Sequence, residues 1–274
     1  MAMSGLQVYK LLPKTNCKDC GFPTCLAFAM KLAAKQVELG DCPHVSDEAT
    51  EALSAASAPP IRLVKIGTGD REFQVGNETV MFRHEKTFFN KPGLALRVKD
   101  TEEAGAIAAK VEMVNDYCVE RVGIDMTFSA VAIDNASGDA ATFAGTVEAV
   151  RAQTDLPFVL ISDNADALKA ALDKEGGHQP VLHAATIDNW EAMAAVAKEA
   201  KASLVVRSQD GLEELADLTK KLSDAGVADL VLDPGSRDLA TSLSQVTQLR
   251  RLALKKNFRP LGYPIITFPG EVAD

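Results

Sequence analysis

The feature that most constrains the fold is an alternation, after Pro92, of short apolar segments and longer amphipathic segments. The apolar segments are typical of strands buried on both faces, because they lack the polar alternation of a half-exposed strand. Strand starts recur roughly every 22 to 36 residues, the length of one strand–helix unit. We therefore predict a parallel sheet covered by helices. The expected strands are residues 94–98, 130–134, 158–162, 180–184, 203–208, 229–233 and 264–268.

This repeat length favours an α/β fold of the (β/α)₈ TIM-barrel type. An open, doubly wound sheet is the alternative, but no G-x-G-x-x-G motif opens any expected helix, so a dinucleotide-binding sheet has no support. Seven strands are expected over residues 93–274, one fewer than a complete barrel needs. An incomplete barrel leaves apolar strand edges unpaired. Either the chain is part of a longer one, or a partner or another segment covers the open edge. We favour the first explanation and expect a truncated barrel.

A small, mainly helical domain is expected over residues 1–58. Apolar residues recur there at helical spacing, and the consecutive prolines at 59 and 60 stop a helix and indicate a linker. Residues 59–92 contain strand-like pieces separated by glycine turns, which predict a hairpin or short meander. The helically spaced residues are Leu26, Met30 and Ala33, followed by Ala49, Leu53 and Ala56.

Composition limits the classes of protein to consider. With 274 residues and 47% hydrophobic content, the chain can bury one large core or two smaller ones, so disorder is not expected. The formal net charge of −9 argues against nucleic acid or an anionic membrane as a partner. Lys31 interrupts the apolar run of residues 26–34 before it could cross a bilayer, and no signal-peptide pattern follows Met1. We expect a cytoplasmic protein.

Four of the five cysteines lie within the first 42 residues, in the spacing C-x₂-C-x₄-C-x₁₆-C. The odd total and the size of the chain argue against a disulfide framework and for reduced, metal-ligating thiols. Three closely spaced thiolates and a remote fourth suit a [4Fe–4S] cluster, because a loop can wrap three corners while a distant residue caps the last. The predicted ligands are Cys17, Cys20, Cys25 and Cys42.

Structural zinc is the alternative for these thiols, although zinc sites usually show two separated C-x-x-C pairs. Gly21 permits a tight turn that aims backbone N–H groups at the sulfurs, and Phe22, Leu26 and Phe28 could screen a cluster from water. Two further residues have a functional and a structural interpretation. His44 is a candidate ligand, but a surface position is favoured, and Cys118, at helical spacing in an apolar stretch, is expected as a buried core thiol.

Three stretches of the sequence resemble one known family. They are the opening YKLLPKTNCKDCGFPTCLAFAMKLA with the later DCPHVSDEA, the linker APPIRLVKIG, and DLVLDPGSRDLATSLSQVTQLRRLALKKNFRPLGYPIITFPG. On these residues the chain is similar to the N-terminal part of the large (gamma) subunit of the corrinoid iron–sulfur protein of the CO dehydrogenase/acetyl-CoA synthase system. The resemblance covers essentially the whole chain.

The resemblance implies a [4Fe–4S] domain held by the four cysteines, a TIM barrel, and a C-terminal corrinoid domain that is absent from these residues. No Asp-x-His-x-x-Gly cobalamin signature occurs in the sequence, so the corrinoid is expected in the full-length complex and not on this chain alone. The family's carrier passes a methyl group from methyltetrahydropterin to acetyl-CoA synthase, and its cluster returns Co(II) to Co(I). The implied partners are a small barrel subunit, forming a heterodimer, a methyltetrahydropterin methyltransferase and acetyl-CoA synthase.

Polar residues follow the predicted strands, where catalytic groups of TIM barrels lie. Acids and amides there could bind a pterin ring, so a pterin-dependent methyltransferase is one alternative function, and a ferredoxin-like electron carrier is another. Asp, Asn and Ser before helices are also preferred N-caps, and we assign no catalytic residue. The candidate residues are Asp134, Asn135, Asp163, Asn164, Arg207, Asp233, Pro234, Gly235 and Ser236, and the candidate caps are Asp163, Asn164, Asn189, Ser236 and Asp238.

Overall fold

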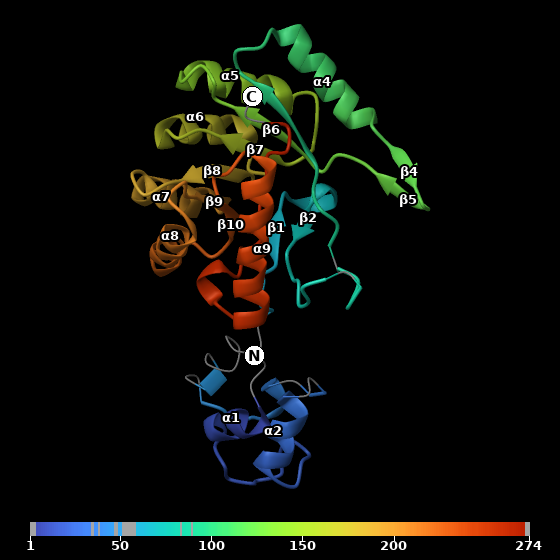
Figure 1. The fold of residues 1–274 in the computed structure, drawn as a ribbon, viewed down its shortest axis with the longest axis vertical. Helices are drawn as coiled ribbons and strands as arrows, with labels where there is room; N and C mark the ends of the chain where they lie inside the picture. Colours follow the sequence, from blue (N-terminus) through green and yellow to red (C-terminus); the bar gives the residue numbers. More distant parts are fainter. Residues whose placement is uncertain are drawn as a thin grey trace. The chain divides into compact units, whose positions relative to one another are not determined.

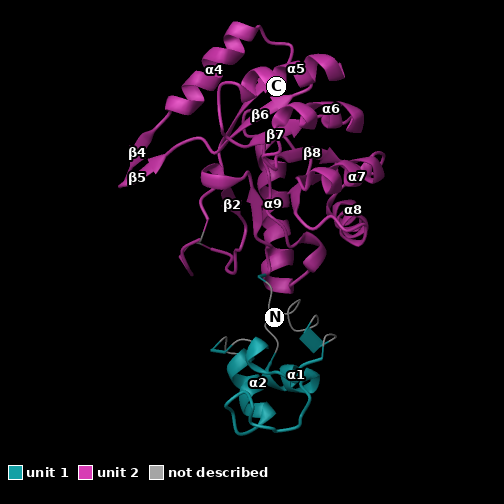
Figure 2. Cartoon of the chain, turned by 180° about the vertical axis from the view of Figure 1, so that it is seen from behind, with its two compact units in different colours: residues 1–59 teal, residues 60–274 magenta. Residues whose placement is uncertain are grey.

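The computed structural model divides the chain into two compact units, Met1–Pro59 and Pro60–Asp274 (Figure 2). Each unit is described by itself. The structure describes residues 4–33, 36–37, 39–46, 49–50, 59–82, 84–88 and 90–271.

The first unit is helical and is built around one apolar cluster. Helix α1 (Gly5–Leu11) begins after Ser4 with a capping box, in which the Ser4 hydroxyl accepts from Gln7 N and the Gln7 side chain accepts from Ser4 N. It packs against α2 (Cys25–Ala33), which is followed by a 3-10 turn, η1 (Leu39–Asp41). The buried apolar residues of the cluster are Val8, Leu12, Cys25, Phe28, Ala29 and Cys42.

The predicted helix around residue 26 is confirmed, but its buried face is not the predicted one. Leu26 and Met30 are exposed, because the face that joins the apolar cluster of the unit carries Phe28. The second predicted helical set consists of Ala49, which is buried, and of Leu53 and Ala56, which lie outside the described residues.

The second unit contains six parallel strands whose order in the sheet follows the chain, with a helix after each strand (Figure 1). The α/β prediction is confirmed, and β3 and β10 are the edge strands. The strands are β3 (Ala95–Lys99), β6 (Ala130–Asp134), β7 (Phe158–Ile161), β8 (Val181–Ala185), β9 (Ser203–Arg207) and β10 (Leu230–Asp233). The helices are α4 (Ala104–Asp116), α5 (Ala140–Arg151), α6 (Ala165–Glu175), α7 (Trp190–Ala200), α8 (Leu212–Asp224) and α9 (Leu239–Lys256), with a 3-10 turn, η3 (Arg259–Leu261), after α9.

Both faces of this sheet are buried, which explains why its strands are apolar throughout. Alternate residues of a strand point to opposite faces. On β6, Val131 and Ile133 pack with the helices, whereas Ala130 and Ala132 belong to a second apolar layer. Protein therefore surrounds these strands, and no helix among the described residues is both long enough and apolar enough to span a lipid bilayer.

A short hairpin contributes to the second layer. β1 (Val64–Ile66) pairs antiparallel with β2 (Phe73–Val75), and a 3-10 turn, η2 (Gly69–Arg71), lies between them. Apolar side chains of both strands pack with residues of the sheet's second face. The predicted hairpin is confirmed, whereas its third strand-like piece, residues 78–85, forms no strand in the described part of that segment.

The seventh predicted strand, residues 264–268, lies beside the edge strand β10. Leu232 N donates to Pro264 O at 2.8 Å, and Ile266 N donates to Leu232 O at 3.0 Å. This is a single parallel bridge rather than a full strand pairing. A cavity of about 940 Å³ is lined by this segment, by the second face of the sheet and by the opposite edge strand β3. The sheet would close into a barrel across this cavity, between residues 264–268 and β3. Barrel closure stays a prediction.

An insertion separates α4 from β6. Helix α4 ends at Asp116, and the chain then forms an antiparallel arm, β4 (Val119–Arg121) and β5 (Ile124–Met126), which projects from the unit (Figure 1). The amphipathic stretch after the first predicted strand, residues 101–122, is therefore helical only over Ala104–Asp116. Cys118 lies beyond the end of α4 and is exposed, so the prediction of a buried core thiol is wrong.

Candidate functional site

The loop that carries the first two cysteines has an unusual backbone. Lys14, Asn16, Lys18 and Gly21 all have positive φ, from 50° to 80°. Left-handed residues turn successive backbone N–H groups toward a common centre and form concave nests of the kind that hold anions and iron–sulfur clusters. Lys14 and Lys18 carry side chains that disfavour this conformation, whereas asparagine and glycine tolerate it, so the loop holds free energy of strain at the two lysines.

The four cysteines of the motif differ in burial. Cys17 is exposed, Cys20 is half-buried, and Cys25 and Cys42 are buried. Cys25 and Cys42 belong to the same apolar cluster as Phe28, and Cys20 packs against that cluster. The motif therefore has a water-accessible corner at Cys17 and an apolar interior.

Hydrogen bonds and electrostatic interactions bring the motif together. Asn16 N donates to Cys25 Sγ at 3.4 Å, and Cys25 N donates to Asn16 Oδ1 at 2.8 Å. Burial raises the pKa of the Cys42 thiol, and the other three thiols of the motif raise it further. Cys42 shares one apolar cluster with Cys25, and Cys20 packs against this cluster, so the remote Cys42 lies near the other cysteines of the motif.

A polar pair lies beside the exposed corner of the motif. His44 Nε2 is 2.6 Å from Asp19 Oδ2. Hydrogen bonding to His44, and to a lesser extent to Cys17, lowers the pKa of the Asp19 carboxyl. One ligand atom from each of these three residues lies within 4.8 Å of the other two. The predicted surface position of His44 is confirmed, and the structure adds its contact with the motif.

A network of charged side chains lies at the carboxyl ends of the parallel strands. Arg237 donates to both carboxylate oxygens of Asp233, at 3.0 and 2.9 Å. His183 Nε2 lies 2.9 Å from Asp233 Oδ2, and Gly235 N donates to Asp233 Oδ1 at 2.8 Å. Burial raises the pKa of the Asp233 carboxyl, but the bonds from His183 and Arg237 outweigh burial and hold this pKa well below its usual range.

Glu271 extends the network to the other edge of the sheet. Arg237 Nε donates to Glu271 Oε2 at 2.7 Å, and Arg97 pairs with Glu271 Oε1. Arg97 also donates to Asp134 Oδ2, at 2.6 and 3.2 Å. The Phe268 ring centre lies 4.5 Å from the Arg237 guanidinium carbon and 5.9 Å from that of Arg97. The last described segment of the chain is thereby tied to both edge strands.

Two buried nitrogen atoms near the carboxyl edge, His183 Nδ1 and Arg207 Nε, have no hydrogen-bond partner among the described residues. Arg207 is opposite Asp233 in the register of β9 and β10, but Arg237 and His183 already occupy the Asp233 carboxylate. In the neutral His183 ring the proton is assigned to Nε2, which faces the carboxylate, so Nδ1 is an acceptor.

The polar residues predicted at the carboxyl edge fall into two groups. Asp134 and Asp233 are members of the charged network. Asn164 and Asp238 accept bonds from backbone N–H groups in the first turns of α6 and α9, which confirms both as caps. Asn189 precedes α7 but makes no side-chain bond to the N-terminus of that helix. The remaining predicted caps, Asp163 and Ser236, are not the N-cap residues of α6 and α9.

Sequence reasoning missed four members of the network. His183 had a signal, because it is a histidine inside an otherwise apolar strand. Arg97 had the same signal in β3. Arg237 and Glu271 had none, because their partners are fixed by the path of two loops, and the sequence pattern does not predict that path.

The fold and the site define a class of protein: an α/β unit with a charged carboxyl edge, joined to a cysteine-rich helical unit. The family model described as CO dehydrogenase/acetyl-CoA synthase delta subunit matches residues 63–272. A second model, described as "Putative Fe-S cluster", matches residues 12–44. The chain belongs to the CO dehydrogenase/acetyl-CoA synthase delta subunit family.

Named relatives confirm the resemblance seen in the sequence. The chain is 47% identical over 266 residues to the corrinoid/iron-sulfur protein large subunit of Moorella thermoacetica, with 97% of this chain and 59% of the relative covered. It is 38% identical to the acetyl-CoA decarbonylase/synthase complex subunit gamma 2 of Methanosarcina mazei, and 37% identical to the subunit gamma of Methanopyrus kandleri, with 97% of this chain and 58% of each relative covered. The chain therefore spans about three-fifths of the length of these relatives.

Proposed function

We propose that this chain is the iron–sulfur part of a corrinoid methyl carrier, with a [4Fe–4S] cluster held by four cysteines of the first unit. The ligands are Cys17, Cys20, Cys25 and Cys42. The observation that carries the proposal is that Cys20, Cys25 and Cys42 share one apolar cluster, while Cys17 and Cys20 lie on a loop of left-handed residues, within the segment matched by the iron–sulfur family model. The named relatives are corrinoid/iron–sulfur and decarbonylase/synthase subunits, which agrees with this role.

The geometry of the motif suits a cluster better than a single zinc ion. Four thiolates around one zinc, each about 2.3 Å from the metal, would lie about 4 Å from one another. Among the described residues, one group of potential ligand atoms lies within 4.8 Å of one another, and it comes from Cys17, Asp19 and His44. The four cysteine sulfurs do not form such a group. A wider thiol arrangement leaves room for a cluster whose corners are separate iron atoms.

The residues of the first unit supply three further requirements of such a site. The buried positions of Cys25 and Cys42, with Phe28 in the same cluster, exclude water from one side of the site. The Asn16 amide supplies a hydrogen bond to sulfur, which is one of the groups that set a cluster's potential. Cys17 leaves one corner at the surface, where an electron can enter or leave.

In the carrier we propose, a bound cluster would supply the electron that returns cobalt from Co(II) to the methyl-accepting Co(I) state. The corrinoid belongs to the full-length complex, in which the methyl group passes from methyltetrahydropterin to acetyl-CoA synthase. A small barrel subunit is the proposed heterodimer partner, and the second unit is proposed to be a TIM barrel in the complete protein. The six strands in chain order, with the seventh segment beside β10, support that fold.

The ion pairs at the carboxyl edge favour this role over a pterin-dependent methyltransferase. The residues that would have to bind the pterin ring are Asp134, Asn135, Asp163 and Asp233. Arg97 holds Asp134, and Arg237 and His183 hold Asp233. A substrate would have to displace these charge-assisted bonds before it could use either carboxylate.

The test is electronic absorption and EPR spectroscopy of the anaerobically purified chain, before and after strong reduction, with iron, zinc and cobalt measured on the same sample. We expect about four irons per chain, a broad visible charge-transfer band and an S = 1/2 signal on reduction. One zinc per chain with no visible band would contradict the proposal and leave the cysteine unit as a structural zinc site.

A further inference from the structure

The two-stranded arm after α4 is exposed on both faces. All six residues of β4 and β5 are exposed, and each strand is three residues long. An isolated two-stranded ribbon is marginally stable in water, because it has no third strand or helix to bury an apolar face. The arm nevertheless carries a substantial apolar surface.

The cross-strand register divides the arm into two unlike faces. Val119 is opposite Met126, and Arg121 is opposite Ile124, so the apolar side chains share one face, which also carries Arg121. Val119, Ile124 and Met126 are 36%, 47% and 43% exposed. A ribbon with this alternation is typical of a strand pair whose apolar face packs against another surface.

The opposite face of the arm carries two acids in an unfavourable position. Glu120 is directly opposite Asp125 on the neighbouring strand. Like charges at opposed cross-strand positions repel and destabilise the pair. Among the described residues neither acid has an ion-pair partner, so a lysine or arginine from outside the arm would relieve this repulsion.

The tip of the arm contains a valine where turn chemistry favours asparagine or glycine. Val122 has a φ of 52° and Gly123 a φ of 72°, so both central residues of the turn are left-handed. A β-branched residue in this region is a rare and strained choice. Its side chain is fully exposed, so no contact with another described residue offsets the strain.

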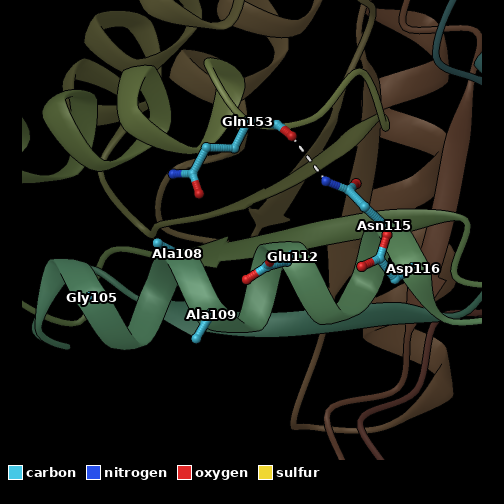
Figure 3. Close-up of a pocket in the computed structure, with 7 residues that line it drawn as sticks. All are labelled: Gly105, Ala108, Ala109, Glu112, Asn115, Asp116 and Gln153. Carbon is cyan, nitrogen blue, oxygen red and sulfur yellow. Dashed lines mark hydrogen bonds between the residues drawn. The ribbon is translucent and has the colours of Figure 1, made fainter.

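A groove along α4 continues this surface. It has a volume of about 550 Å³, and one side of it is the flank of α4 that carries Ala108, Ala109 and Glu112 (Figure 3). Gln153 borders it, and its carbonyl oxygen accepts a bond from Asn115 at 2.9 Å. The groove ends at Asp116, directly before the arm begins. Its lining is Gly105, Ala108, Ala109, Glu112, Asn115, Asp116 and Gln153.

The charge of this region identifies the chemistry of its partner. Residues 101–127 contain six acids and two bases, a formal charge of −4. A surface with an apolar cleft for the arm and lysine or arginine side chains around it would bury the apolar face, neutralise the opposed acids and hold Val122. This one kind of surface would therefore compensate for the exposed apolar face, the repulsion between the opposed acids and the exposed tip of the free arm.

We propose that the arm and the α4 groove form the docking surface for a second protein subunit that presents an apolar cleft with a basic rim. We identify that subunit as the small barrel partner, and this identification rests on the proposed function. The exposed apolar face, the opposed acids and the strained tip are its structural basis.

The test uses Val122→Asn, which removes the apolar tip and places a residue that tolerates the left-handed turn. The full-length protein and the small barrel subunit are produced separately, and their affinity is measured by calorimetry beside thermal unfolding of each variant. We expect an unchanged or higher unfolding temperature and at least a tenfold higher Kd. Asp125→Lys, which repels a basic rim, is expected to weaken binding to a similar degree.

Leu239→Asn is the matched control, because Leu239 is an apolar residue whose side chain is also exposed (85%) and which lies in α9, outside the arm and the α4 groove. Its Kd should stay within twofold of the wild-type value. The proposal is overturned if Val122→Asn binds normally, if the control loses as much affinity, or if the wild-type protein does not bind this subunit. A wild-type homodimer that Val122→Asn dissociates would also overturn it, since the occupant would then be a second copy. Cluster spectra of the same samples report separately on the proposed function.

Discussion

His183 Nε2 and Asp233 Oδ2 lie 2.9 Å apart, although β9 separates their two strands. Strands separated by one neighbour are about 10 Å apart, so the two side chains meet above β9. Both side chains are almost completely buried there, and Arg237 binds the same carboxylate. The contact therefore holds one acid in its charged form inside the protein.

This relationship predicts acid sensitivity. The pKa of the Asp233 carboxyl is lower in the folded than in the unfolded protein, so the charged carboxylate stabilises the fold. This contribution to the free energy of unfolding is fully present above the unfolded-state pKa, about 3.9, and is lost as the pH falls below that value toward the folded-state pKa. Asp233→Asn should remove this part of the pH dependence. Urea unfolding at pH values between about 5 and 2.5 would show a shallower loss of stability in the variant than in the wild-type protein. Equal slopes would contradict the prediction, and Asp224→Asn, at an exposed position outside the network, is the control.

Glu271 should anchor the last described segment of the chain. Its carboxylate bridges Arg97 and Arg237, which belong to opposite edges of the sheet. Glu271→Gln weakens two charge-assisted bonds, and since the side chain is about one-third exposed, we expect a loss of about 1 to 2 kcal/mol in the free energy of unfolding. Limited proteolysis should also cut residues 264–271 faster in the variant. Glu213→Gln, at an exposed position in α8, should change neither measurement.

The buried pair Arg151–Glu175 should contribute more to stability than a surface pair. Glu175 is completely buried, and Arg151 Nη2 donates to its Oε1 at 2.8 Å. Glu175→Ala leaves the arginine without a counter-charge in a site where burial already lowers its pKa, so we expect a loss of about 3 to 5 kcal/mol. Glu148→Ala breaks the exposed pair with Lys174 and should cost less than about 1 kcal/mol. Similar losses in both variants, measured by chemical denaturation, would contradict this difference.

The iron content of serine variants should distinguish the four cysteines of the motif from Cys118. Cys42→Ser removes a ligand at the buried side of the proposed site, so the visible charge-transfer band should fall and the iron content should drop below about four per chain. Cys118→Ser is the matched control, because Cys118 is exposed in the arm region and lies outside the motif. Full iron content in Cys42→Ser, or an equal loss in Cys118→Ser, would show that the motif is not the cluster site.

The parts of the fold set by local pattern could be predicted from the sequence. The apolar strands from Ala95 to Asp233 stand out because both faces of the sheet are buried, and the hairpin before them is marked by glycine turns. The arm was not predictable in the same way. Val119, Ile124 and Met126 alternate with charged residues, but the helical pattern of α4 runs directly into them without a proline or glycine stop before Gly123.

In the candidate site, too, local features could be predicted and contacts between distant segments could not. The spacing of the four cysteines is a local feature, so the sequence predicts the site, whereas the contact of His44 with Asp19 depends on the return of a remote segment. At the sheet, position after a strand predicts the presence of Asp134 and Asp233 at one edge. Their charge partners depend on where the chain crosses that edge again, near Glu271.

The chain-order arrangement of the six strands has a consequence for biosynthesis. A ribosome releases β3 first and β10 last, and each new strand pairs with the strand released just before it. The sheet can therefore grow at one side while translation continues, without waiting for a distant segment. The first strand of this sheet keeps an open side throughout its growth, so the earliest of the six strands is also the one that needs shielding for longest.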